Sequence, residues 1–204
     1  MRTAFKEWAI VVDALGRGAQ ILILRKGGLR EGSGGFRLEQ RQFLLFPTLF
    51  HQQRASVLPA AQSRFDEIEP HFPPSEVLRF QYFATLVAAR KVNSLAGVAA
   101  LRGQHIWRDE VIADRFSWGP EGGIFALAVR VFRLPQPVDI PLSAAYGGCK
   151  SWIETEVEVP VAGAIPVLSN VEFARALARF ENALTESPVL ELPTDRRQSL
   201  ESPA

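Results

Sequence analysis

Cysteine, histidine and long apolar runs are scarce in this 204-residue sequence, which has 1 cysteine and 3 histidines. A single cysteine excludes an internal disulfide, and CxxC and HExxH patterns are missing, so we expect no metal site and no cofactor. Charged side chains such as Asp13 and Arg90 interrupt every apolar stretch before about 18 residues, which predicts no transmembrane helix. Lys6 and Glu7 break the apolar region that a signal peptide needs, which favours a cytoplasmic protein without a membrane partner.

The composition is that of a globular protein, with 47% apolar and 22% charged residues. A chain of this length buries enough surface to fold without a disulfide or a structural metal, so we expect a single globular domain over residues 1–184. Residues 185–204 carry prolines and charges without periodicity and are expected to form a disordered tail.

The formal net charge of +1 conceals an uneven distribution. Residues 1–64 hold ten basic and four acidic residues, a surplus of +6, whereas residues 151–204 hold four and nine, a deficit of −5. Of the 23 basic residues 19 are arginine, whose planar guanidinium suits phosphate and carboxylate groups. The arginine bias is equally compatible with a GC-rich coding sequence.

The first 46 residues predict a helix and two strands. Thr3 can cap a helix that runs to Leu15 and ends at Gly16, because apolar residues recur at helical spacing. The apolar run 20–25 predicts a buried strand, and residues 42–46 predict a second one that ends at Pro47. The two strands could pair across the glycine-rich loop between them.

The middle of the sequence alternates between loops and regular elements. Residues 48–76 contain several prolines and predict a loop with helical turns at 49–54 and 60–65. Residues 77–92 alternate well enough for a long strand, with a helix as the competing interpretation. The following residues predict a helix capped by Ser94, a short strand at 105–107 and a helix capped by Asp109.

The last third contains the clearest strand, at residues 123–134, which is apolar on both faces and is followed by prolines. One more strand is expected within 151–159, and a capping-box pattern from Ser169 to Glu172 starts a helix. Strands with helices between and around them predict an α+β fold, a small curved mixed sheet or partly closed barrel with surrounding helices.

The glycine-rich stretch 27–35 is the first candidate site. Glycines let backbone N–H groups approach a phosphate, and basic side chains surround the stretch. No GK[ST] or GxGxxG pattern accompanies it, so the loop predicts contact with a nucleic-acid backbone, or else a flexible hairpin loop. The candidate nucleic-acid-binding residues are Arg25, Lys26, Arg30, Arg37 and Arg41.

Residues 147–152 (GGCKSW) form the second candidate. Lys150 could lower the pKa of Cys149, which would make the cysteine a nucleophile, and these two residues are the weak catalytic candidates. The competing interpretation is a glycine turn next to a buried cysteine. No catalytic base stands close in the sequence, which favours a binding protein over an enzyme.

Histidines beside aromatic and amide side chains suggest a pocket that stacks a base and hydrogen-bonds its edge. A protein core explains these residues equally well, and the four tryptophans are more typical of a core. A nuclease is not supported, because E-x-K, HNH and GxSxG patterns are missing. The pocket candidates are His51, Gln52, His105, Trp107 and Trp152.

A resemblance to a known family is carried by residues 4–28, FLLFPTLFHQ at 43–52, HIW at 105–107, VRVFRLPQP at 129–137 and GGCKSW at 147–152. These segments resemble an uncharacterised bacterial family known as domain of unknown function 1802. Some of its members are associated with a restriction-endonuclease domain of the Mrr type, which implies a part in restriction or defence and a nuclease partner. This chain has no nuclease segment of its own.

A weaker similarity is to the PUA and ASCH barrel superfamily, because a helix, a turn at 16–18 and strands at 21–25 and 43–46 resemble its opening. That similarity implies binding of RNA or of modified DNA bases. The leading hypothesis is therefore a nucleic-acid-binding accessory module of a restriction or defence system, with DNA or RNA as partner. The alternatives are a small enzyme that uses residues 147–152 and a scaffold for a nuclease that binds no DNA.

Overall fold

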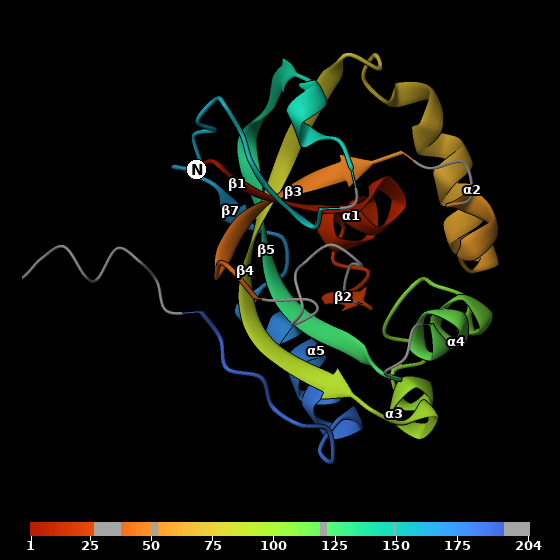
Figure 1. Ribbon diagram of the computed structural model, residues 1–204. Coiled ribbons are helices and arrows are strands. Elements are labelled where there is room, and N and C mark those ends of the chain that lie inside the picture. Colours follow the sequence, from red (N-terminus) through yellow and green to blue (C-terminus); the bar gives the residue numbers. More distant parts are fainter. Residues whose placement is uncertain (27–37, 50–52, 119–121, 149, 194–204) are drawn as a thin grey trace, which may run out of the picture.

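The computed structural model describes residues 1–26, 38–49, 53–118, 122–148 and 150–193 (Figure 1). Its strands build one sheet, and helices pack on and beside that sheet. The strands are β1 (Thr3–Trp8), β2 (Leu22–Arg25), β3 (Gln42–Thr48), β4 (Val77–Val92), β5 (Ile124–Pro141), β6 (Trp152–Glu154) and β7 (Ile165–Pro166). The α-helices are α1 (Ala9–Gly16), α2 (Pro59–Ile68), α3 (Leu95–Ala100), α4 (Asp109–Ser117) and α5 (Asn170–Ala183).

The sheet has the order β2-β5-β4-β3-β1-β6, and β7 pairs with β5 outside this path. β1 and β3 are parallel and the other pairs are antiparallel, so the sheet is mixed. The β4–β5 ladder shifts register between Phe80 and Tyr82 and again between Leu86 and Ala88. Such irregularities bend strands, and Figure 1 shows β4 and β5 curling together. The predicted α+β fold with a small curved mixed sheet is confirmed.

The sequence prediction was wrong for residues 3–8, which form a strand and not the start of a helix. Ala4 and Phe5 pair with Leu44 and Leu45 of β3, and β6 pairs on the other side of β1. Apolar residues at positions 5, 8 and 9 fit a helix and a strand equally well locally. Pairing with two distant strands makes residues 3–8 a strand, and the helix begins only at Ala9.

The two early strands exist, but they do not pair with each other. β2 pairs with β5, whereas β3 lies between β1 and β4. Prolines also end fewer elements than expected, because β3 continues through Pro47 to Thr48 and β5 continues to Pro141. Two strands are shorter than expected. The strand predicted at 105–107 is reduced to one bridge between Val57 and Trp107, and the strand predicted within 151–159 covers only Trp152–Glu154.

Helix ends largely follow the sequence signals. Ser94 accepts a hydrogen bond from the Gly97 N–H, and Ser169 and Glu172 form the expected capping box of α5. Asp109 is the first residue of α4 and not its cap. Within the stretch from residue 185 onward, residues 187–190 lie along the end of β4, where the Leu190 N–H bonds the Ala89 carbonyl.

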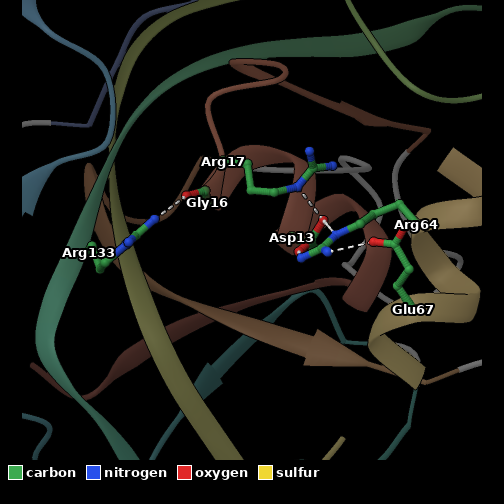
Figure 2. A network of polar contacts seen from close by, with 6 residues as sticks. All are labelled: Asp13, Gly16, Arg17, Arg64, Glu67 and Arg133. Carbon is green, nitrogen blue, oxygen red and sulfur yellow. Dashed lines mark hydrogen bonds and ion pairs between the residues drawn. The ribbon is translucent and has the colours of Figure 1, made fainter. Parts of the chain in front are cut away.

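An ion-pair network joins the first two helices (Figure 2). Asp13 of α1 accepts hydrogen bonds from Arg17 at 2.8 Å and from Arg64 of α2 at 2.9 Å, and Arg64 also bonds Glu67. Arg133 of β5 donates to the Gly16 carbonyl at the end of α1. Among the described helices, none is long and apolar enough to cross a membrane.

Candidate functional site at the end of strand β1

Residues from β2, from β3 and from the segment before β6 meet at the last three residues of β1, Lys6, Glu7 and Trp8. We call this region the β1 end. β3 runs parallel to β1, so Thr48 lies opposite Trp8, and its Oγ1 donates to the Glu7 carbonyl at 3.0 Å. Lys6 Nζ donates to the Gly148 carbonyl at 3.1 Å, which places the residues around 147–152 on the other side of β1.

The charged core of the β1 end is formed by Glu7 and Arg25. Glu7 is 2% exposed, and its Oε1 accepts a hydrogen bond from the Trp8 N–H at 2.7 Å. Arg25, at the end of β2, donates through Nη2 to the Lys6 carbonyl and lies with its guanidinium 4.7 Å from the centre of the Phe5 ring. Arg25 Nε stands 4.0 Å from Glu7 Oε2, an ion pair without a hydrogen bond.

Arg115 of α4 completes the cluster. Its guanidinium lies 4.5 Å from the centre of the Trp8 ring and 5.6 Å from that of Trp107, a cation–π arrangement between two indoles. Burial lowers the pKa of Arg115, Glu7 opposes this shift and the positive charge of Arg25 adds to it. No hydrogen bond or salt bridge to the Arg115 guanidinium occurs within the part of the chain that the structure describes.

Lys26 adds a third cation beside Arg115. Its Nζ donates to the Phe116 carbonyl at 2.9 Å and to the Gly123 carbonyl at 3.0 Å. Among the described residues, the charged core of the β1 end thus holds Arg25 and Arg115 against the single carboxylate of Glu7. Buried charges are normally paired, so an excess of positive charge in a part-buried place favours an anionic ligand.

Unsatisfied polar atoms are concentrated in the same place. Six buried side-chain nitrogen or oxygen atoms of the described residues lack a hydrogen-bond partner. Only Arg90 Nε lies elsewhere, in β4. Leaving a buried polar atom unbonded costs about 1–3 kcal/mol, so such atoms are rare without a functional reason. The other five atoms are Glu7 Oε2, Arg25 Nε, Gln53 Oε1, Trp107 Nε1 and His105 Nδ1.

Contacts between residues link some of the side chains that carry these atoms. Gln53 Nε2 donates to the carbonyl of Thr48, the residue that also bonds Glu7. The His105 ring lies 5.7 Å from that of Trp107, and Arg115 links Trp107 to Trp8. Burial is the main cause that lowers the pKa of His105, which therefore stays neutral at neutral pH.

Two cavities are lined by residues named above. The first, of about 580 Å³, is lined by His105 and Trp107 and has the ion pairs Arg102–Asp109 and Arg108–Glu110 at its rim. The second, of about 570 Å³, is mostly apolar and reaches Lys6 and Thr48. Volumes of this size are typical of ligand-binding pockets.

The predicted site residues lie in different environments in the structure. Arg25 and Lys26 are part-buried and bond backbone carbonyls, whereas Arg41 and Lys150 are exposed. His105 and Trp107 line a cavity, whereas Trp152 packs in the core against Phe5 and Phe43. Outside the described residues lie Arg30, Arg37, His51, Gln52 and Cys149.

Sequence reasoning missed Glu7, Arg115 and Trp118. Glu7 was hidden because residues 3–8 looked helical, and an isolated glutamate carries no motif. Trp118 was grouped with core tryptophans, yet it is 51% exposed at the end of α4. In the described ranges no three His, Cys, Asp or Glu side chains gather into a candidate metal site.

The chain belongs to the family described as Domain of unknown function (DUF1802), which it matches over residues 4–179. Among solved structures it is similar to the crystal structure of ASCH from Zymomonas mobilis, with 12% sequence identity and a TM-score of 0.41, over 93% of this chain and 97% of that one. No curated protein matches it.

Proposed function

We propose that this protein is a nucleic-acid-binding module that holds a single strand at the β1 end. The observation that carries the proposal is the concentration of unsatisfied buried polar atoms around an excess of positive charge. A nucleic acid can match both the positive charge and the unsatisfied polar atoms, because its phosphates are anionic and the edges of its bases donate and accept hydrogen bonds.

Arg115 is the residue that we assign to a phosphate. The Trp8 ring orients its guanidinium, and its N–H groups have no hydrogen-bond partner among the described residues. A guanidinium presents its donors in the fork geometry that a phosphate accepts. Trp118 follows three residues later and offers an exposed indole on which a base can stack, as single-strand-binding proteins commonly use.

Several other arginines are paired with carboxylates inside the protein, which agrees with a nucleic-acid contact confined to the β1 end. The basic surplus of the first third is partly neutralised within the protein, since Arg17 and Arg64 pair with Asp13, and Arg54 pairs with Asp66. Arg79, Arg102 and Arg108 are also paired with carboxylates. These residues therefore do not form a uniformly basic face. The β1 end differs from them, because positive charge is in excess there.

Fluorescence anisotropy with labelled single-stranded DNA, single-stranded RNA and duplex DNA tests the proposal. We expect a single strand to bind best and binding to weaken between about 50 and 200 mM salt, as phosphate contacts require. Arg115→Gln and Trp118→Ala should each raise the Kd about tenfold, since a base stack or a charged contact is worth about 1–3 kcal/mol. Arg179→Gln, an exposed charge removed on α5, is the matched control. No binding to any of the three nucleic acids would overturn the proposal.

The proposal extends to modified DNA and to a nuclease partner in restriction or defence, an extension supported by the family resemblance alone. The same assay with base-modified strands tests it, and equal affinity for modified and unmodified strands would contradict it. The enzyme alternative at residues 147–152 gains no support from the described residues, because Trp152 is a core residue and Lys150 is exposed.

A further inference from the structure

We propose that the cavity of about 570 Å³ binds a small amphipathic carboxylate, a molecule with an apolar body and one carboxylate group. We call it the β3–β4 cavity, because residues 46–48 of β3 and residues 77–79 of β4 line it. Binding of such a molecule is a second activity of the protein, which does not depend on the binding of a nucleic acid.

The cavity exists because two neighbouring strands of the sheet separate. β3 pairs with β4 at residues 42–44, and this pairing does not extend to residues 45–48. Residues 77–80 of β4 pair with β5 instead, and the β4–β5 ladder shifts register immediately after Phe80. Pro47 has no N–H group with which to continue a ladder toward β4. The space between the ends of the two strands is therefore a consequence of the sheet itself.

The lining of the β3–β4 cavity is mainly apolar. Phe46, Leu78 and Tyr146 are buried and belong to one hydrophobic core cluster. Leu49 and Leu142 line the same cavity but are 56% and 44% exposed. Covering exposed apolar side chains with an apolar ligand removes them from water, which is favourable. The apolar body of a ligand therefore has a matching surface here.

Lys6 gives the cavity its positive charge. Among the described residues that line it, Lys6 and Arg79 are the charged ones, and aspartate and glutamate are missing. Arg79 is neutralised by Asp139 through two hydrogen bonds of 2.7 Å. Lys6 Nζ donates to the Gly148 carbonyl and lies 5.7 Å from the centre of the Phe46 ring. A carbonyl oxygen orients an ammonium group without cancelling its charge, so an anionic group is attracted to this wall.

The hydroxyl groups of the lining are engaged within the protein. Thr48 Oγ1 donates to a backbone carbonyl of β1, Ser143 Oγ donates to the Glu156 carboxylate, and Tyr146 Oη accepts from the Glu156 N–H. Lys6 is thus the main polar anchor, and one positive charge balances a carboxylate better than a doubly charged phosphate. A volume of about 570 Å³ lies in the range of pockets that hold small molecules.

Isothermal titration calorimetry of the whole chain with octanoate, 1-octanol and octylammonium tests the proposal. These three ligands share one alkyl chain and differ in charge. We expect octanoate to bind about tenfold more tightly than 1-octanol, as a hydrogen bond between charged groups implies, and octylammonium to bind most weakly. Octanoate that binds no more tightly than 1-octanol, or that does not bind, would overturn the proposal.

Lys6→Met keeps a long side chain and removes its charge. It should weaken the binding of octanoate about tenfold and leave that of 1-octanol unchanged. Lys150→Met, at an exposed lysine that does not line the cavity, is the matched control and should alter neither affinity. An octanoate affinity that Lys6→Met leaves unchanged would overturn the proposal. If Lys6→Met does not fold, the comparison of the three ligands on the unchanged protein still decides.

Discussion

Arg25 Nε lies 4.0 Å from Glu7 Oε2, so a side chain at the end of β2 meets one at the end of β1. In the sheet these two strands are separated by β5, β4 and β3. The contact exists because the sheet curls until its first and fifth strands face each other, which is the sense in which the fold is a partly closed barrel.

We predict that Arg25→Gln destabilises the protein by about 3 kcal/mol, because it leaves the Glu7 carboxylate buried without its ion partner. Glu7→Gln should cost less, since Arg25 is part-buried and retains the Lys6 carbonyl. Urea unfolding measures both, with Arg179→Gln as the control for loss of a surface charge. Equal stability of Arg25→Gln and the unchanged protein would contradict the prediction.

We predict that His105 makes stability depend on pH. Burial lowers its pKa in the folded protein below the ordinary value of 6.5, so the unfolded chain binds the proton more readily. The contribution of His105 is therefore complete above pH 6.5 and is lost as pH falls from there through the lowered pKa. Urea unfolding above and below pH 6.5 should show a smaller loss for His105→Gln than for the unchanged protein. His71→Gln, a substitution of an exposed histidine, is the matched control variant.

The Asp13 network should couple α1 to α2. Asp13→Asn removes the carboxylate charge that pairs with Arg17 and with Arg64 and is expected to cost about 1 kcal/mol, because both arginines are partly exposed and salt screens such pairs. Arg17→Gln alone should cost less. A double-mutant cycle of Asp13→Asn and Arg64→Gln, measured at low and high salt, gives their coupling energy, which should shrink with salt. Additive effects at low salt would show that the pair contributes nothing.

Gly16→Ala is expected to destabilise the protein by about 1–3 kcal/mol through overpacking. A Cβ at this position would overlap the Tyr82 ring and come within 2.7 Å of its hydroxyl oxygen. Tyr82→Leu should relieve the clash, so the double variant should lose less stability than the sum of the two single variants. Thermal unfolding of all four proteins measures this coupling, and a fully additive result would refute the overlap.

The sequence by itself determined the elements whose signals are local. The alternation of residues 77–92 and the apolar run from 123 onward became β4 and β5, and the signals at Ser94 and Ser169 capped α3 and α5. These features could be predicted because a hydrogen bond between residues three apart, or a period of two along a strand, is written in neighbouring residues.

Only the tertiary structure decided that residues 3–8 are a strand, that β2 and β3 separate, and which arginines are neutralised. Each of these outcomes depends on a partner far along the chain, such as Leu44 for Ala4, Ala128 for Leu22 and Asp13 for Arg64. The candidate site belongs to this second group. Glu7 and Arg115 carry no motif, and they belong to one site because the curled sheet and α4 bring their charges close enough to interact.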